Sequence, residues 1–355
     1  MGIYIFNIIS IFFLAFLFFI FIPIKNRKEC FLFFTFVQLF FISALRYEVG
    51  LDFINYIGTF QLVKMRSSIS ELLGLGKITT VEYGYLFLNR AIGLLTNQSQ
   101  WIFIVTSFII IYLVFRTVKD YSSIAWMSIY LFSVEAYISS FNIMRQYIAV
   151  SIVFFSYKYV KKRNFNKFLL SILIASMFHT SALLVLPVYF ILNKNLNIKI
   201  IVYSIFIGFI VSIFFDSIIS IIQKVFYGKY IESSFGMFSG NINNVIIAFV
   251  YFSMAMIFKK NLLKRNNDNN ILINWSFINL ALSIMSMNMW IITRFMSYSS
   301  IFNILLIPEI IISIKDKLIR RSMIIVIIIF TLLLYFNTIT NPANKLIPYQ
   351  ILKSF

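Results

Sequence analysis

The sequence predicts an all-α, polytopic integral membrane protein, and three observations lead to this fold class. Hydrophobic residues make up 61% of the 355 residues, and charged residues make up only 12%. The mean hydropathy of +0.90 exceeds what a single soluble core can bury. Long apolar runs alternate with short basic clusters, as the positive-inside rule predicts. The net charge of +19 therefore indicates basic connectors beside a lipid bilayer and no nucleic-acid partner.

Eleven apolar segments approach the roughly 20 residues that a helix needs to cross a bilayer. In chain order they lie near 3–23, 30–45, 100–115, 122–140, 142–158, 167–192, 200–220, 243–258, 271–290, 293–314 and 322–340. The first has neither a basic region before it nor a small-residue cleavage site, so we expect a retained spanning helix. The single cysteine, Cys30, excludes an internal disulfide.

Six connectors between these segments are strongly basic and together hold 20 of the 31 Lys and Arg residues. They are 25–29, 116–120, 158–167, 194–199, 259–265 and 315–321. Since positive charge favours the inner side of the membrane, we expect all six to face the cytoplasm.

This assignment requires segment 167–192 to enter and leave on the same side, because a basic connector precedes it and another follows it. The polar residues His179, Thr180 and Ser181 divide the segment into halves of about a dozen residues, each reaching roughly 18 Å. We therefore predict a broken-helix hairpin around His179, ten full crossings besides it, and both termini outside the cytoplasm.

The same topology makes the chain a single membrane-embedded domain, 1–355, with its longest connector, 46–99, on the non-cytoplasmic side. Within this connector, 81–96 has apolar residues at helical spacing and predicts an amphipathic helix at the membrane surface. The tail, 341–355, is expected on the same side.

Five ionisable residues at the outer ends or midpoints of apolar runs are candidates for chemistry, because a charge there is costly without a partner, cavity or substrate. They are Arg46, Asp52, Arg145, His179 and Arg294. Three converging arginines would form an anion site suited to phosphate. Structural interpretations stay open: snorkelling or an ion pair with Asp52 or Glu135 for the arginines, a helix cap for Asp52, and a hydrogen-bonded structural role for His179.

Five stretches resemble, in order, elements of the EpsG-like branch of the Wzy-type polysaccharide polymerases. They are "RYEVGLDFINYIGTF", "EYGYLFLNRAIGLLTNQSQWIFIV", the block from "NIMRQYIAV" to "FHTSALLVLPVYFI", "RFMSYSSIFNILLIP" and "IPYQ". The resemblance covers nearly the whole chain. Leu51 stands where the family often has Thr, and 221–242 matches no family element.

The resemblance implies a membrane glycosyltransferase of GT-C-like architecture that joins oligosaccharide repeat units carried on undecaprenyl diphosphate. It also implies a multi-pass protein of the bacterial cytoplasmic (inner) membrane that acts on the outer side of that membrane. It implies no cofactor and no metal, since related enzymes stabilise the diphosphate with arginines and this sequence has no acidic cluster suited to a divalent ion. A co-polymerase that regulates chain length is a further possible partner. The product, whether O-antigen, capsule or exopolysaccharide, is not specified.

By this resemblance we assign Arg145 and Arg294 to the lipid diphosphate, with Arg46 as a third contact or as the partner of Asp52. Either His179 or Asp52 would accept the proton of the attacking hydroxyl, and His179 is preferred because histidine titrates near neutral pH. Sugar contacts are assigned to Gln146, Tyr56 and Tyr298. Glu48 has no role in this scheme.

Two other function classes remain open. A flippase or exporter of lipid-linked oligosaccharide would share the arginines and aromatic residues, although we find no internal repeat of the kind transporters usually have. A membrane acyltransferase that modifies the polysaccharide would need a donor site reachable from the cytoplasm, whereas His179 is expected on the other side.

Overall fold

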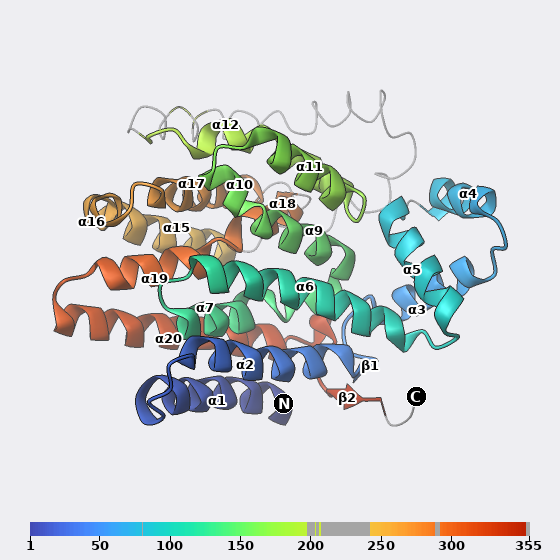
Figure 1. Cartoon of the computed structure of the whole chain (residues 1–355), viewed down its shortest axis with the longest axis horizontal. Helices are drawn as coiled ribbons and strands as arrows, with labels where there is room; N and C mark the ends of the chain where they lie inside the picture. The colour runs from blue at the N-terminus through green and yellow to red at the C-terminus, as the bar shows by residue number, and fades with distance from the viewer. Residues whose placement is uncertain (80, 197–202, 204–205, 207–241, 288–291, 353–355) are drawn as a thin grey trace.

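The computed structural model describes residues 1–79, 81–196, 203, 206, 242–287 and 292–352. Within these ranges the regular secondary structure is helical apart from two short strands, in agreement with the predicted all-α class. Most helices lie side by side along one direction, and α3 (Phe53–Lys64), α4 (Ile69–Thr79) and α5 (Tyr83–Leu95) stand together at one end (Figure 1). The predicted segment 200–220 and connector 221–242 lie largely outside the described residues.

The first half of the bundle is built on long apolar helices. α1 (Gly2–Phe16) continues through a π-helical turn at Leu17–Phe21, and α2 (Arg27–Ala44) returns beside it and packs on α6 (Gln100–Tyr121). Shorter pieces follow: α7 (Ala125–Leu131), a π-helical turn (Phe132–Ala136), α8 (Ser139–Asn142), α9 (Met144–Phe155) and α10 (Tyr157–Lys161). The predicted segments 122–140 and 142–158 are thus broken helices, and Ile143 leaves the helical region with φ −107° and ψ 56°.

The second half repeats this mixture of long and bent helices. Its elements are α15 (Ile242–Ile257), α16 (Lys259–Arg265), α17 (Asn269–Met285), α18 (Ile292–Ser300), α19 (Asn303–Ser313) and α20 (Lys317–Thr340). α20 begins where the Asp316 carboxylate accepts hydrogen bonds from the backbone N–H groups of Leu318 and Ile319, at 2.8 and 2.9 Å.

Several described helices are suited to a bilayer. Gly2–Phe21, Gln100–Tyr121 and Lys317–Thr340 are long and apolar enough to cross a membrane, and two bent helix pairs bring the number to five if each pair is one crossing. Apolar side chains such as Phe13 and Ile329 stay more than half exposed along these helices, as expected for a lipid-facing surface. The figure of ten full crossings stays a prediction.

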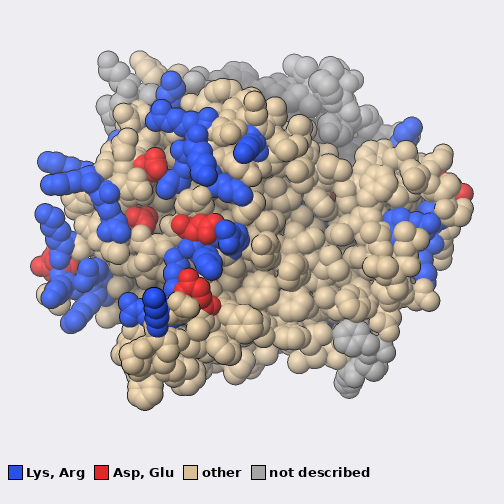
Figure 2. Space-filling view, viewed as in Figure 1, with Lys and Arg blue, Asp and Glu red and all other residues tan. Residues whose placement is uncertain are grey.

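The basic connectors gather at the end of the bundle opposite α3–α5, where Figure 2 shows most of the Lys and Arg side chains on this face. Lys28 donates to the Lys119 carbonyl at 2.9 Å, Lys161 lies over the Tyr121 ring, and Lys259 donates to the Leu196 carbonyl at 2.8 Å. Five predicted connectors and the residues beside them therefore meet at one end, which agrees with the prediction that they share one side.

The segment around His179 doubles back as predicted. α11 (Phe165–Ser176) ends just before His179, a 3₁₀ turn spans Thr180–Val185, and α12 (Val188–Leu192) follows. The ring of Phe165, at the start of the first half, lies 5.1 Å from Tyr189 and 5.4 Å from Phe190, near the end of the second. The start and the finish of the hairpin consequently lie at the basic end of the bundle, and its tip, with His179, points toward the opposite end.

The tail closes over the end of the bundle that holds α3–α5. Strands β1 (Arg46–Tyr47) and β2 (Gln350–Ile351) pair antiparallel, and Tyr349 donates to the Ile42 carbonyl. The Gly50 N–H donates to the Lys345 carbonyl at 2.9 Å. These contacts fix the chain between α2 and α3, where the resemblance places its first motif.

Candidate functional site

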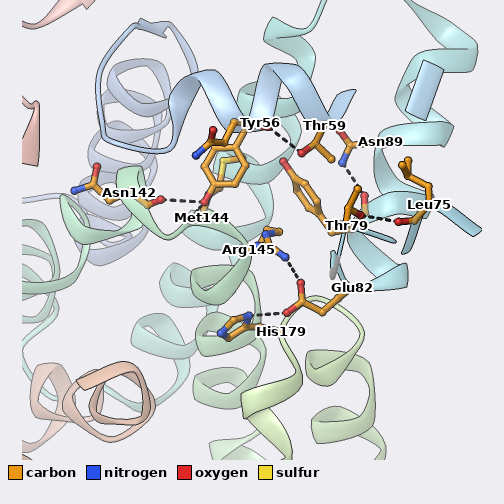
Figure 3. Close-up of polar contacts among 12 residues, drawn as sticks. Tyr56, Thr59, Leu75, Thr79, Glu82, Asn89, Asn142, Met144, Arg145 and His179 are labelled. Carbon is orange, nitrogen blue, oxygen red and sulfur yellow. Dashed lines mark hydrogen bonds and ion pairs between the residues drawn. The ribbon is translucent and has the colours of Figure 1, made fainter. Parts of the chain in front are cut away.

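Glu82 forms the centre of a cluster of charged side chains at the hairpin tip (Figure 3). Its Oε1 lies 2.8 Å from His179 Nδ1, and its Oε2 accepts a hydrogen bond from Arg145, whose charge it balances. The three residues come from the start of α5, the hairpin break and the first turn of α9. Two of the residues that the sequence analysis selected, Arg145 and His179, are therefore brought together by one that it did not.

The glycine two residues after Glu82 explains how the carboxylate reaches His179. The Gly84 N–H donates to the carbonyl of Met177 at 2.8 Å, so the start of α5 rests directly on the end of α11. A Cβ on Gly84 would lie 2.6 Å from that carbonyl oxygen, a separation that atoms do not tolerate. The Glu-x-Gly spacing thus couples an acidic residue to a close backbone contact.

The partners of Glu82 favour its ionised form and outweigh the effect of burial. Its side chain is only 8% exposed, and burial alone would raise the pKa of this carboxyl. The hydrogen bond with His179 and the positive charge of Arg145 act in the opposite direction, and the net effect lowers the pKa. Glu82 is therefore a carboxylate at neutral pH.

A carboxylate on Nδ1 has a defined effect on an imidazole. It holds the tautomer with the proton on Nδ1, which leaves Nε2 as a proton acceptor, and it stabilises the imidazolium that forms when Nε2 takes a proton. The side chain of His179 is 14% exposed, so the ring is only partly enclosed. The Glu82–His179 pair is chemically suited to general base catalysis.

Arg145 keeps hydrogen-bonding capacity beyond its ion pair. Its side chain is 30% exposed and lies 5.9 Å from the centre of the Tyr85 ring, and one of its two terminal nitrogens pairs with Glu82. A guanidinium has five N–H donors in a fixed plane, so an incoming phosphate oxygen can be bound while the ion pair persists.

α18 carries two further predicted residues, Arg294 and Tyr298, and packs against the same hairpin. Gln146 donates its side-chain amide to the backbone carbonyl of Arg294, which joins α9 to α18. One turn later, the Tyr298 hydroxyl lies 3.0 Å from that of Ser181, two residues after His179. Arg294 itself is exposed on α18.

Arg46 lies apart from this cluster. It is 1% exposed, and its guanidinium lies between the rings of Phe103 and Phe141, 4.9 and 4.6 Å from their centres. It donates to the Ser43 hydroxyl at 3.0 Å and makes no ion pair with Asp52. Stacking on two aromatic faces compensates for the lost hydration of this buried cation.

Asp52 and Tyr56 lie around α3. Asp52 precedes the first residue of α3, as predicted, but its carboxylate does not cap the helix and instead accepts from the Asn55 amide at 3.2 Å. The Tyr56 hydroxyl donates to the Asn142 carbonyl and accepts from the Met144 N–H, at 2.9 and 2.8 Å. Tyr56 thus anchors the bend that precedes Arg145.

The glycine of the first motif has the same kind of steric reason as Gly84. Gly50 has φ +102°, and a Cβ there would lie 2.8 Å from the Asn142 side-chain oxygen. That oxygen accepts a hydrogen bond from the Leu51 N–H at 2.8 Å. The motif after α2 therefore packs on the Asn that begins the Arg145 motif.

Comparison with family models gives a match over nearly the whole chain. The family model described as the EpsG family matches residues 29–351. The chain belongs to the EpsG family. Searches of curated proteins and of solved structures gave no match. EpsG membership and the apolar helices together indicate a membrane protein of polysaccharide biosynthesis.

The Glu82 cluster differs from the expected site in two ways: it includes Glu82, and Arg46 lies apart from it. In the sequence, Glu82 was visible only as the acidic residue at the start of the amphipathic helix predicted at 81–96. The structure gives this helix as α5, Tyr83–Leu95. Glu135, weighed beforehand as an arginine partner, instead accepts from Tyr251. Among the described residues, no three His, Cys, Asp or Glu side chains are grouped as metal ligands would be.

Proposed function

We propose that this EpsG-family protein is a polysaccharide polymerase that joins oligosaccharide repeat units carried on undecaprenyl diphosphate. The reaction would take place at the outer side of the bacterial cytoplasmic membrane. Family membership supports a polymerase role, and the Glu82–Arg145–His179 cluster is the observation that carries the assignment to this site.

In the proposed reaction, a hydroxyl oxygen of the acceptor unit attacks the anomeric carbon of the growing chain. His179 Nε2 takes the hydroxyl proton, while Glu82 holds the ring through Nδ1 and balances the imidazolium charge. The bond between the anomeric carbon and the phosphate oxygen breaks, and the electron pair leaves with the lipid diphosphate. Inversion at the anomeric centre is expected by family resemblance.

The negative charge on the leaving diphosphate requires stabilisation as it develops. We assign this to Arg145 and Arg294, whose guanidinium groups stay charged at any working pH, without a metal ion. Gln146 and Tyr298 connect α9, α18 and the hairpin, and are proposed to position the sugar. Asp52 would contact the acceptor beside α3, and Tyr56 is proposed to position the site by holding the bend before Arg145. Arg46 is proposed to support the site from within the core, since its side chain is almost fully buried.

The test replaces Arg145, His179 and Arg294 by Ala, one at a time, in a host that makes the polymer. Each variant should abolish long chains and leave single repeat units on the cell surface. Arg116→Ala, in an exposed ion pair with Asp120 at the basic end, is the control and should leave chain length unchanged. Full-length polymer in normal amounts from all three site variants would refute the assignment.

The cell-surface readout also separates the alternatives. If the protein is a flippase, the site variants trap repeat units inside the cell. If it is an acyltransferase, the polymer keeps its length and loses acyl groups. Whether a co-polymerase binds is measured separately, by co-purification of the intact protein from the same membranes.

A further inference from the structure

A polar cavity of about 300 Å³ lies inside the helical bundle, separate from the Glu82 cluster. It is enclosed by the π-helical turn at Phe132–Ala136 and by parts of α8, α9, α15 and α17–α20. Its volume is at the lower end of the range of about 300–1,000 Å³ that is typical of ligand pockets. Eleven of its 18 described lining residues have polar side chains, including Glu135, Tyr147, Asn244, Asn279, Ser297 and Asn303.

Several of these polar groups have hydrogen-bonding capacity that the protein does not use. Asn303 is 2% exposed, and no described residue forms a hydrogen bond with its side-chain amide. Asn279 is 3% exposed and accepts from Ser299 at 3.1 Å, but its amide nitrogen has no acceptor among the described residues. The unused amide atoms of both residues are accessible from the cavity, so they can form hydrogen bonds with a polar occupant there.

The charge of the lining restricts the kind of occupant. Among the described residues that line the cavity, Glu135 is the only acidic or basic one, and one of its oxygens accepts from Tyr251. Because these lining residues include no Lys, Arg or His, the cavity is unsuited to a diphosphate. Amides, hydroxyls and one carboxylate offer donors and acceptors together, which is what the hydroxyl groups of an uncharged sugar need.

The cavity adjoins the Glu82 cluster through two shared helices. On α9, Tyr147 lines the cavity two residues after Arg145. On α18, Ser297 lines it beside Tyr298, which contacts the hairpin. The α20 residues in the lining, Thr331 and Thr338, lie in the second half of that helix, away from the basic connector at its start.

We propose that this cavity binds an uncharged sugar residue of the oligosaccharide repeat unit, through Asn279, Asn303 and Glu135. The inference rests on the proposed function for the identity of the sugar carrier, and it adds a saccharide subsite that the Glu82 cluster does not contain. Sugar hydroxyls replace the hydrogen bonds that the two amides lack. The repeat unit is thereby held with its reacting end toward α9 and α18.

The test measures binding of single repeat units, prepared by depolymerising the host polysaccharide, to the purified full-length protein. Asn279→Leu and Asn303→Leu keep side-chain size and remove the amide, and each should weaken binding about tenfold or more because a sugar hydroxyl loses its partner. The control Ser283→Ala, one turn beyond Asn279 on α17 and outside the cavity, should bind like the unaltered protein.

A second measurement does not depend on the stability of the leucine variants. A single cysteine is introduced by Ser297→Cys in a Cys30→Ser background, and its modification by a neutral thiol reagent is timed. Repeat units should slow the modification at least several-fold. Unchanged modification with repeat units, or protection by a simple ammonium salt in their place, would overturn the proposal.

The two proposals fail independently. If His179→Ala abolishes polymer while the leucine variants bind repeat units normally, the cavity proposal is wrong and the polymerase assignment stands. If His179→Ala and Arg145→Ala leave polymer intact while repeat units still protect the cysteine, the polymerase assignment at Glu82–His179 is wrong and the cavity binds sugar.

Discussion

At the residue scale, the candidate site depends on contacts between side chains that are far apart in the sequence. Glu82 meets Arg145 and His179 across separations of 63 and 97 residues. Arg145 and His179 were predictable because each interrupts an apolar run, where a charge needs a reason. Glu82 was not predictable as a site residue, because an acidic residue at the start of an amphipathic surface helix needs no partner beyond water.

Glu82→Gln tests whether this carboxylate positions the base. The amide keeps the size of the side chain but removes the charge that stabilises the imidazolium, so kcat for joining repeat units should fall about a hundredfold or more while KM changes little. The measurement is in vitro polymerisation by the purified protein. Glu48→Gln is the matched control, because Glu48 is exposed, and it should retain full activity. Equal rates for the two variants would contradict the role of Glu82.

Gly84→Ala tests the close contact that brings Glu82 to His179. The added Cβ would lie 2.6 Å from the Met177 carbonyl oxygen, so α5 must shift away from the hairpin tip. We expect polymer length to collapse and the protein to lose about 1–3 kcal/mol of stability, measured by thermal unfolding in detergent. Gly74→Ala in α4 meets nothing within 4 Å and should be neutral or slightly stabilising. Normal polymer from Gly84→Ala would show that the contact is dispensable.

At the scale of elements, the sequence was most informative where polarity changes abruptly. The hairpin around His179 follows from two basic connectors on either side of one apolar segment, and the structure confirms the reversal through the contact of Phe165 with Tyr189. Hydropathy did not predict the breaks within 122–158, because a window of about 20 residues averages over Glu135 in the π-helical turn and over Asn142 and Arg145 beside the non-helical Ile143. Hydropathy reports burial in lipid and is insensitive to such local bends.

The hairpin makes a prediction about membrane sides. In a Cys30→Ser background, cysteines replacing Lys162 and Lys194, one at a time, should both react with a membrane-impermeant reagent only from the cytoplasmic side. A cysteine replacing Met65, which is 77% exposed in the connector between α3 and α4, is the control and should react from the outside. Labelling of the two lysine positions from opposite sides would mean that 167–192 crosses the membrane once.

At the scale of the whole molecule, one end of the bundle is basic and the other holds α3–α5, the tail and the Glu82 cluster (Figures 1 and 2). The alternation of apolar runs and basic clusters was enough to predict this polarity. The basic residues lie in connectors between the apolar runs, and their order along the chain indicates which connectors share one side of the membrane. It could not predict how the motifs pack on one another. Gly50 against Asn142 and Gly84 against Met177 are contacts between motifs, and each depends on the folded bundle.

This polarity predicts the orientation of the whole protein in the membrane. The connectors that hold 20 of the 31 Lys and Arg residues should remain in the cytoplasm, so the tail paired with β1 must lie outside it. Alkaline phosphatase fused to the C-terminal end should therefore be active and green fluorescent protein fused there dark, whereas fusions after Arg265 should give the opposite pattern. The Arg265 fusions control for expression and for the competence of both reporters. A fluorescent C-terminal fusion with inactive phosphatase would place the Glu82–His179 pair in the cytoplasm, where a polymerase acting on exported repeat units could not use it.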